Sequence, residues 1–595
     1  MYSDAHLERI HSHRSARALI WSDGEIEQLD DARGARLLAE APELVRYALV
    51  LAASDVGHVT FTWARPRESW LLVHLTCAAP RCDARIVVTA ELEVQETHPF
   101  SLTERELDIL TLLCAGFSNP EVGDRLHRGR KTVATHVERV LAKLDQPTRA
   151  GAAAVALEFG LVRLPIPGGP GGFEHLAIGA VEASVRADEP VGEPVVSPLR
   201  RTIASRPLLI GLAVPNQGLV GSDRDEVMNG CALAIAEVNE HGGVGGRGLE
   251  RVTVDIAIDD PASVRDGFRQ LVAADVDAIM IHYAWIEDAS VFRKVSEYGC
   301  PLLTSLQSER QARWVSENPE TLGRVFQITS VWTHYGAGFF RLLGALEQTG
   351  TWTPQSRRVV CVETRVGAGQ VYDERAAGAA RQLDWQVARI LEVATLNADW
   401  SDALECIREC SPAAVLVTHF VPGELARFQK LFVEDPRDSL IYCIYAPSVP
   451  EYHNRAGNAA EGVVWSTVAG TYSDAIGRAF MRRYEERFSR PPGRSSAGTA
   501  YDGVNLVANA WVRAGNPRAF DRVAQELRSS VYRGVNGVYS LGNPGQTGLS
   551  YPEDTLDPST SLAALVFQIQ DGENRILSPV TYAESAFRLP PWFAT

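Results

Sequence analysis

The chain has 595 residues, of which 45% are hydrophobic and 22% charged, and its formal net charge is −16. These values indicate a globular protein of several domains. No uninterrupted apolar run reaches the length of a membrane span, and residues 1–21 lack the apolar core of a secretory signal. We therefore expect a cytoplasmic protein without a membrane partner.

The cysteines and the catalytic motifs point away from metal sites and enzymes. Nine cysteines, an odd number, are spread over the whole chain, so a complete disulfide framework is not expected. The pairs Cys77/Cys82 and Cys406/Cys410 lack the second pair or the histidines that a zinc site requires. A Gly-rich phosphate loop, a nucleophile elbow and a paired metal motif are also missing. We predict no metal, no cofactor and no catalytic residues.

Residues 1–98 are predicted to form a small α+β module. The piece ALIWSDGEIEQLD is followed by a helical stretch through Leu51, and then by two strands around a Pro-containing turn in WLLVHLTCAAPRCDARIVVTAELEV. The arrangement resembles the small PAS- or GAF-like modules. Two interpretations stay open, a sensory pocket or a packing and dimerisation unit without ligand, and the second is favoured.

Residues 99–163 are predicted to be an all-α helix-turn-helix. Thr103 and Glu106 have the spacing of a capping box at the start of the first helix. The third helix is expected from Lys131 to Leu144, where two faces separate by about 120°, taking 100° per residue. The apolar face is formed by Val133, Val137, Val140 and Leu144. The polar face is formed by Thr132, Thr135, His136, Arg139 and Lys143.

The charge of this segment favours a nucleic-acid partner. From Arg125 to Arg149, seven Arg or Lys residues stand against two acidic residues, a local balance of +5 in an acidic chain. A cationic stripe of this kind suits the phosphate backbone of DNA. The alternative is a solvated helix face whose basic bias is accidental.

Residues 101–161 resemble the LuxR-type DNA-binding domain, because LTEREL, the Gly-Phe-Ser-Asn turn, KTVATHV and LAKL occur in its order and spacing. The resemblance implies binding to double-stranded DNA, with a recognition surface made of Lys131, Thr132, Thr135, His136, Arg139 and Lys143. Two positions depart from the family. Gly129 replaces a capping Ser, and Gly123 replaces an Ala, which is expected to loosen its helix by up to about 1 kcal/mol.

Residues 164–205 are rich in Pro, Gly and Ala without periodicity, and are predicted to be a linker. From there, residues 206–595 alternate apolar strands with amphipathic helices, which predicts two doubly wound α/β lobes. The predicted strands are Leu208–Val214, Val252–Ile258, Ala278–Ile281, Pro301–Thr304, Arg358–Thr364, Ala413–Val417 and Leu440–Tyr445. The predicted helices are Glu226–Asn239, Val264–Ala274, Glu287–Tyr298, Thr333–Glu347 and Leu425–Phe432.

This region resembles the type I periplasmic-binding proteins, the solute-binding proteins for branched-chain amino acids, amides and urea. The likeness rests on the stretch from Asn239 to Glu250 with its spaced glycines, and on the later Ala-Tyr-Asp signature at Ala500–Asp502. It implies a clamshell of two lobes that closes on a small polar metabolite such as an amino acid, an amide or a urea-like compound.

Ligand contacts are expected in the loops that follow the strands, where open α/β sheets bind their ligands. The predicted contacts are Gln217, Tyr283, Trp285, Gln307, Ser308, Tyr372, Thr418 and Tyr445. For each of them the alternative is a packed loop residue. His419 is interpreted as a hydrogen-bonded structural histidine.

These elements predict a one-component transcription regulator that senses a metabolite and binds DNA as a homodimer. Two alternatives remain. The first alternative is the receptor of an ABC importer, and the missing signal peptide and lipidation Cys argue against it. The second is an interaction scaffold with a vestigial cleft.

Overall fold

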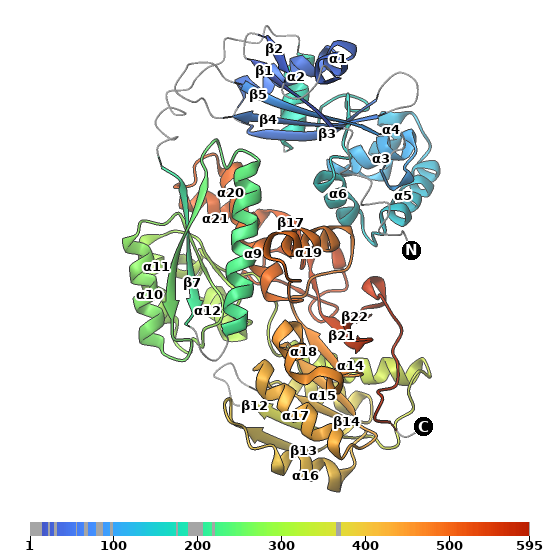
Figure 1. The fold of residues 1–595 in the computed structure, drawn as a ribbon, viewed down its shortest axis with the longest axis vertical. Coiled ribbons are helices and arrows are strands. Elements are labelled where there is room, and N and C mark those ends of the chain that lie inside the picture. The colour runs from blue at the N-terminus through green and yellow to red at the C-terminus, as the bar shows by residue number, and fades with distance from the viewer. Residues whose placement is uncertain are drawn as a thin grey trace. The chain divides into compact units, whose positions relative to one another are not determined.

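The computed structural model describes residues 15–21, 24–28, 33–54, 56–64, 70–78, 87–95, 99–173, 176–187, 206–216, 221–364 and 370–593. The chain divides into two compact units (Figure 1). The first unit contains Met1–Pro207 and Glu237–Leu249, and the second contains Leu208–Ala236 and Glu250–Thr595. Each unit is described by itself.

The first unit begins with a sheet of the order β2-β1-β5-β4-β3-β6. Its first five strands pair antiparallel, while β6 joins β3 in parallel. Buried and half-buried residues alternate along β4 from Leu71 to Cys77, as expected for a strand with one face on a core. The strands are β1 Ser15–Trp21, β2 Ile26–Gln28, β3 His58–Ala64, β4 Trp70–Ala78, β5 Val87–Gln95 and β6 Arg163–Leu164.

Three helices pack against this sheet: α1 Arg33–Glu40, α2 Glu43–Ala53 and α7 Ala177–Arg186. The position of α7 corrects the predicted linker, because residues 176–187 belong to the packed module. The Ala and Gly residues that predict a linker instead allow close packing here: a Cβ on Gly179 would lie 2.1 Å from the carbonyl oxygen of Phe173. Residues 188–205 lie outside the described part of the chain.

A buried carboxylate fixes α7 in place. Glu182 is fully buried and accepts hydrogen bonds from the Tyr47 hydroxyl on α2, from the amide of Ile166 at 3.2 Å and from Nε of Arg186 at 2.7 Å. Burial raises the pKa of Tyr47 far above its ordinary value, so this hydroxyl stays protonated and donates. The chain after the helix-turn-helix is therefore tied back to the sheet by polar contacts as well as apolar ones.

The predicted helix-turn-helix is confirmed, with helices α3 Glu104–Cys114, α4 Asn119–Leu126, α5 Arg130–Leu144 and α6 Arg149–Glu158. The capping box is also confirmed: the amide of Thr103 donates to Glu106 at 2.8 Å, and the amide of Glu106 donates to the Thr103 hydroxyl at 3.3 Å. All four residues of the predicted apolar face of α5 are buried.

The helix-turn-helix and the sheet share β6, so the predicted boundary at residue 163 cuts through a strand. The amide of Arg163 donates to the Thr111 hydroxyl of α3 at 2.9 Å, and its side chain forms ion pairs with Glu104 and Asp108. At the same time Arg163 pairs with Thr62 of β3. One residue thus connects the helix-turn-helix to the module.

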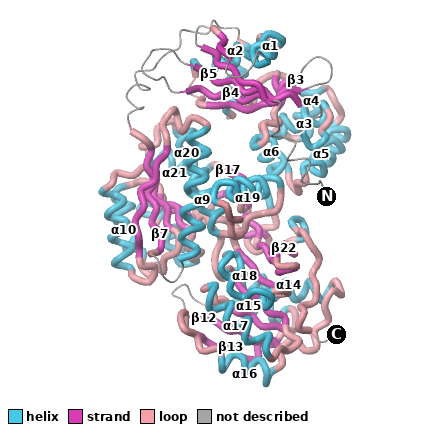
Figure 2. Tube along the Cα trace, in the orientation of Figure 1, coloured by secondary structure: helices cyan, strands magenta, loops and turns pink. Residues whose placement is uncertain are grey.

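The second unit has two lobes, each built on a sheet with helices on both faces (Figure 2). The first sheet has the order β11-β10-β9-β7-β8, and its pairs β7–β9, β9–β10 and β10–β11 are parallel. Its strands are β7 Leu208–Pro215, β8 Leu249–Ile256, β9 Ala278–Ile281, β10 Leu302–Thr304 and β11 Val325–Gln327. Its helices are α9 Gly221–Glu240, α10 Pro261–Ala273, α11 Arg293–Tyr298, α12 Glu309–Glu317 and α13 Pro319–Leu322.

The second sheet has the order β13-β12-β14-β15-β16-β21-β22, with an antiparallel edge made by β21 and β22. Its strands are β12 Arg358–Thr364, β13 Gln386–Val393, β14 Ala414–Val417, β15 Leu440–Ile444, β16 Val464–Thr467, β21 Leu565–Gln570 and β22 Glu573–Ser578. Its helices are α14 His334–Gln348, α15 Glu374–Gln382, α16 Ser401–Cys410, α17 Pro422–Glu434 and α18 Pro450–Ala456.

Three late helices return to the first lobe: α19 Ala475–Phe488, α20 Ser496–Ala514 and α21 Phe520–Ser529. A Cβ on Gly230 of α9 would lie 2.1 Å from the carbonyl oxygen of Ala497, so α9 and α20 pack closely at that glycine. The short pairs β17 Val531–Gly534 with β18 Gly537–Ser540, and β19 Ser550–Tyr551 with β20 Leu562–Ala563, complete the unit.

All seven predicted strands of this region are present within a few residues of their expected bounds. The strands that the sequence did not predict are β11, β13, β16, β21 and β22 of the two main sheets and the short strands β17, β18, β19 and β20. The edge strand β13 carries charged residues and is mostly half-buried or exposed, so it lacks the apolar run of a central strand.

Candidate DNA-binding surface and ligand pocket

The outward face of α5 is a row of exposed side chains. Lys131, Thr132, Thr135 and Arg139 are exposed, and His136 is half-buried. The Thr135 hydroxyl donates to the carbonyl of Lys131 at 3.2 Å. Nδ1 of His136 is buried without a hydrogen-bond partner among the described residues.

The seven cations of this segment divide into two groups. Arg125 lies 4.1 Å over the Phe117 ring, Arg149 donates to Asn119 at 2.7 Å, and Lys143 is also held inside the fold. Four cations are exposed and have no partner in the described part of the chain: Arg128, Arg130, Lys131 and Arg139. The positive surface is therefore smaller than the sequence count of seven, and it lies at the start and middle of α5.

Lys143 was expected on the DNA surface, and the structure gives it an intramolecular role. Its ammonium donates to Glu106 at 2.6 Å and to the carbonyl of Ser101 at 2.7 Å. Burial raises the pKa of Glu106, but hydrogen bonds from Lys143 and Thr103 outweigh it and leave the pKa lowered. This ion pair ties the end of α5 to the start of α3.

The two glycine departures have different consequences. Gly129 caps α5 without a side-chain hydrogen bond, as expected. Gly123, expected only to loosen α4, has a steric reason instead: a Cβ there would lie 2.7 Å from the carbonyl oxygen of Arg128. The tight turn between α4 and α5 therefore excludes the methyl group of alanine unless the backbone shifts.

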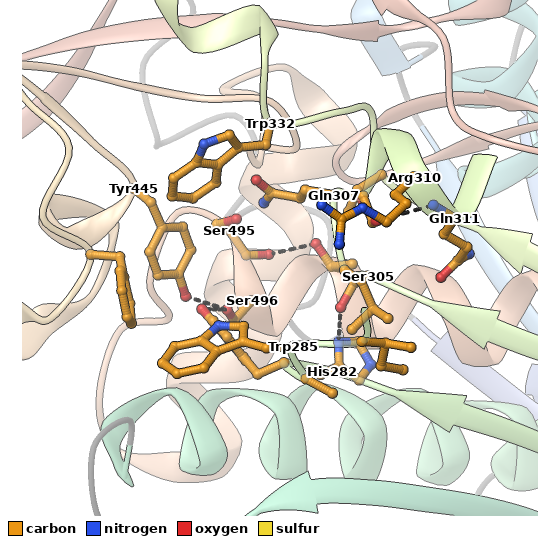
Figure 3. Close-up of a pocket in the computed structure, with 18 residues that line it drawn as sticks. His282, Trp285, Ser305, Gln307, Arg310, Gln311, Trp332, Tyr445, Ser495 and Ser496 are labelled. Atoms are coloured by element: carbon orange, nitrogen blue, oxygen red, sulfur yellow. Dashed lines mark hydrogen bonds between the residues drawn. The ribbon is translucent and has the colours of Figure 1, made fainter. Parts of the chain in front are cut away.

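The second site is a cavity in the second unit, at the carboxyl ends of strands from both sheets. It encloses about 1050 Å³ of space, part of it open to solvent. The first lobe contributes the loops after β9, β10 and β11, the second lobe contributes the loops after β14 and β15, and α20 contributes its N-terminus (Figure 3).

Aromatic side chains form the walls of this cavity. Tyr283 and Tyr445 meet at 5.9 Å between ring centroids, and Trp285 meets Phe420 edge-on at 6.1 Å. Figure 3 shows Trp332 and Trp285 on opposite sides of the open space, with Tyr445 between them at one end. Such walls suit a flat or apolar ligand body.

Several buried polar atoms around the cavity have no hydrogen-bond partner among the described residues. They are Nε2 of His282, Oε1 of Gln311, Oγ1 of Thr329 and Nε1 of Trp332. Nδ1 of His282 lies 2.7 Å from the Ser305 hydroxyl, and burial lowers the pKa of His282 to about 4, so the ring is neutral. Unsatisfied buried polar groups are costly, which makes them candidates for ligand contacts.

The backbone of the cavity is held in an uncommon conformation. Tyr283, Gln307 and Tyr445 have φ values of 57°, 54° and 51°. Bulky residues rarely adopt positive φ, and such positions concentrate at functional sites.

A buried carboxylate lies behind the aromatic walls. Asp223 of α9 accepts hydrogen bonds from the Tyr445 hydroxyl and, at 3.1 Å, from the Tyr283 hydroxyl. The Tyr445 oxygen also lies 2.7 Å from the Ser496 hydroxyl. Burial raises the pKa of Asp223 to about 7, although the hydrogen bond from Tyr445 acts in the opposite direction. Because Asp223 and Tyr445 come from different lobes, this bond holds the lobes together.

Five of the eight predicted ligand residues line this one cavity: Tyr283, Trp285, Gln307, Ser308 and Tyr445. Their contact with a ligand stays a prediction. Gln217 lies outside the described residues. Thr418 and Tyr372, also predicted as ligand contacts, are not among the residues that line the cavity: the buried Thr418 hydroxyl accepts the amide of Thr364 at 3.1 Å, and the amide of Tyr372 donates to Glu363 at 2.7 Å.

The sequence reasoning missed Arg310, Gln311, Thr329, Trp332 and Ser496 as cavity residues. Arg310 could have been predicted from the sequence, because it follows the predicted ligand residues Gln307 and Ser308 within one helical turn. His419 is a structural histidine as expected, with Nε2 3.2 Å from the carbonyl of Ala394 and Nδ1 accepting the amide of Val421 at 3.3 Å.

Within the described residues, no three His, Cys, Asp or Glu side chains gather in a way that would hold a metal ion. In the same part of the chain, every helix is too short or too polar to cross a bilayer.

The second unit has the fold of type I periplasmic-binding proteins, and the first unit carries a LuxR-type helix-turn-helix. Residues 207–549 match the family described as "Periplasmic binding protein", and residues 100–156 match "Bacterial regulatory proteins, luxR family". The first match covers more than half of the chain, and the protein belongs to the periplasmic binding protein family.

The helix-turn-helix is similar to part of the response regulator protein VraR of Staphylococcus aureus (strain Mu3 / ATCC 700698), with 42% identity over 62 residues. This stretch is 10% of the chain and 30% of VraR, so the chain spans less than a third of that relative.

Two solved structures are similar to the second unit. A putative branched-chain amino acid ABC transporter from Silicibacter pomeroyi is 28% identical with a TM-score of 0.59, and the match covers 65% of this chain and 100% of that one. A solute-binding protein of an ABC transporter from R. palustris, in complex with benzoate, is 16% identical with a TM-score of 0.50 and coverage of 65% and 99%. The second likeness shows the fold alone.

Proposed function

We propose that this protein is a one-component transcription regulator, which binds double-stranded DNA through α5 and senses a small polar metabolite in the cleft. The observation that carries the proposal is the row of exposed, unpartnered cations on α5 in a chain whose net charge is −16. An acidic protein concentrates cations on one helix when that helix meets an anionic polymer. Action on DNA is the reason why we place the protein in the cytoplasm.

In this proposal α5 lies in the major groove of DNA. Arg128, Arg130, Lys131 and Arg139 contact phosphates, while Thr132, Thr135 and His136 face the base edges. Lys143 is not included in this surface, because its ammonium is held by Glu106. A single recognition helix contacts few phosphates, so useful affinity requires a homodimer on two half-sites.

In this proposal, ligand binding in the cleft controls DNA binding. A ligand that contacts both lobes favours the closed arrangement, in which the hydroxyl of Tyr445 reaches Asp223. It shifts the equilibrium only by the difference between its affinities for the open and closed states. We propose that closure changes how the homodimer presents its two α5 helices.

The DNA surface is tested with the full chain on a library of genomic fragments, by selection and then by titration of an enriched fragment. We expect Arg139→Ala to weaken binding to all fragments and to reduce the slope of log affinity against log salt by about 1. Arg313→Ala, an exposed arginine of α12, is the matched control and should leave binding unchanged. Equal binding by Arg139→Ala and the unsubstituted chain would remove α5 from the interface.

The sensing role is tested by thermal-shift screening of the full chain against amino acids, amides, urea, polyamines and small organic acids. A ligand at a hundred times its dissociation constant should add about 2.7 kcal/mol to the stability of the second unit. Each stabilising compound is then added to the DNA titration. A compound that stabilises the cleft without changing DNA affinity would contradict the sensing role.

A further inference from the structure

The charged side chain that lines the cleft is positive, and no acidic side chain among the described lining residues balances it. Arg310 brings a permanent positive charge, and none of the described lining residues is Asp or Glu. Asp223 is the nearest acidic group described above, but it is fully buried behind the tyrosines and its Oδ1 accepts both of their hydroxyls. A ligand ammonium group therefore finds no carboxylate in this cavity, whereas a ligand carboxylate finds a guanidinium.

We propose that the cleft binds a monocarboxylate with an aromatic body, rather than an amino acid, amide or urea. This inference rests on the proposed function only in taking the cleft as a ligand site. The ring stacks between the indoles of Trp285 and Trp332, and the carboxylate lies against Arg310. Guanidinium groups bind carboxylates with two parallel hydrogen bonds, and aromatic faces prefer offset or edge-on neighbours.

The geometry of the cavity agrees with this orientation. Figure 3 shows the guanidinium of Arg310 beside Gln307, on the side of the open space away from Tyr445. Arg310 is exposed and has no ion-pair or hydrogen-bond partner among the described residues, so it is available to a ligand. It belongs to the first turn of α12, which Ser308 caps by accepting the amide of Gln311 at 3.1 Å. The positive end of that helix also favours an anion.

Buried polar atoms add a second, independent reason for a ligand at this place. Thr329 and His282 are each 2% exposed, and Oγ1 of Thr329 and Nε2 of His282 have no partner in the described structure. Nε1 of Trp332 is also an unpartnered donor. These groups, like Arg310, can donate hydrogen bonds to a carboxylate, which accepts several.

A cation held by the aromatic walls is the competing chemistry, since indole rings attract quaternary ammonium groups. The charge of the cavity lining disfavours it. A cationic head group would share the cavity with Arg310 and find no lining carboxylate to offset the repulsion.

The test measures binding of four matched compounds and one cationic competitor to the full chain by calorimetry. Benzoate is the reference, benzamide removes the charge, cyclohexanecarboxylate removes the aromatic ring, and phenylalanine adds an ammonium group on a two-carbon spacer. We expect benzoate to bind at least tenfold more tightly than each of the other three, and choline, the cationic competitor, not to compete with it.

Substitutions test whether the named residues cause the preference for benzoate. Arg310→Gln should weaken benzoate at least tenfold and abolish the preference for benzoate over benzamide, while Arg313→Gln on the same helix should change neither. Trp332→Leu should reduce the preference for benzoate over cyclohexanecarboxylate. Tighter binding of phenylalanine than of benzoate, displacement of benzoate by choline, absence of benzoate binding, or an unchanged charge preference in Arg310→Gln would each overturn the inference.

The outcomes separate this inference from the proposed function. If benzoate binds through Arg310 but DNA affinity does not respond, the ligand class stands and the sensing role fails. If an amino acid binds and changes DNA affinity, the sensing role stands and the ligand class fails.

Discussion

The DNA-binding surface and the ligand cleft both present polar groups without partners, but for opposite physical reasons. On α5 the cations Arg130, Lys131 and Arg139 are exposed and have no partner in the described part of the chain, so they contribute little to the fold. In the cleft the groups without partners among the described residues, such as Oγ1 of Thr329 and Nε2 of His282, are buried, and the hydrogen bond from Tyr445 to Asp223 connects the two lobes. Charge changes should therefore affect DNA binding alone at the first site, and stability together with binding at the second.

The largest expected effect tests the cleft side of this comparison, through the protonation of Asp223. Its pKa in the folded chain is raised to about 7, so the folded state holds this proton more tightly than the unfolded state. The resulting stability is complete below pH 4 and is lost as pH rises through about 7. The shift corresponds to a loss on the order of 4 kcal/mol.

Asp223→Asn should remove this pH dependence from the unfolding of the second unit, measured by scanning calorimetry between pH 4.5 and 7.5. Asp225→Asn, an exposed acid on the same helix, should retain it. Arg139→Ala on α5 should also unfold like the unsubstituted chain. Parallel pH profiles for Asp223→Asn and the unsubstituted chain would show that the carboxylate does not couple to folding.

A smaller effect is expected within α5, where Lys143 and Lys131 should behave differently. Lys143→Ala leaves the buried carboxylate of Glu106 without its ammonium partner, and should lower the free energy of unfolding by about 1.5 kcal/mol. Because the pKa of Glu106 is lowered in the folded chain, this loss should be present at neutral pH and shrink as the pH falls.

Lys131→Ala, at an exposed position without a partner, should change stability by less than about 0.5 kcal/mol and weaken DNA binding instead. Chemical denaturation and DNA titration of the two variants check this pair. If Lys143→Ala weakened DNA binding while leaving stability intact, the original assignment of Lys143 to the DNA surface would be restored.

The smallest expected effect concerns the turn before α5. Helix propensity alone predicts that Gly123→Ala stabilises α4 by up to about 1 kcal/mol. The Cβ would lie 2.7 Å from a backbone oxygen, and we expect this contact to dominate and to destabilise the helix-turn-helix by about 1 kcal/mol. Gly378→Ala in α15, where a Cβ meets nothing within 4 Å, should be stabilising. Stabilisation by both substitutions would mean that the turn relaxes freely.

The sequence alone determined the helix-turn-helix and seven strands of the two lobes, because their signals are local. The capping box from Thr103 to Glu106 and the valine face of α5 each lie within a few turns of one helix. The buried strands, such as β9 and β12, appear as short apolar runs. Periodicity and composition are sufficient for elements of this kind.

Only the tertiary structure decided which polar groups are free. Lys143 and Arg139 belong to one predicted stripe, and they differ because Glu106 of another helix reaches Lys143. Tyr283, Trp332 and Tyr445 come from three separate loops and Arg310 from the first turn of α12, and no spacing along the chain predicts that the four line one cavity. Local rules fix the direction of a side chain on its own element, whereas its partner comes from packing between elements that are distant in sequence.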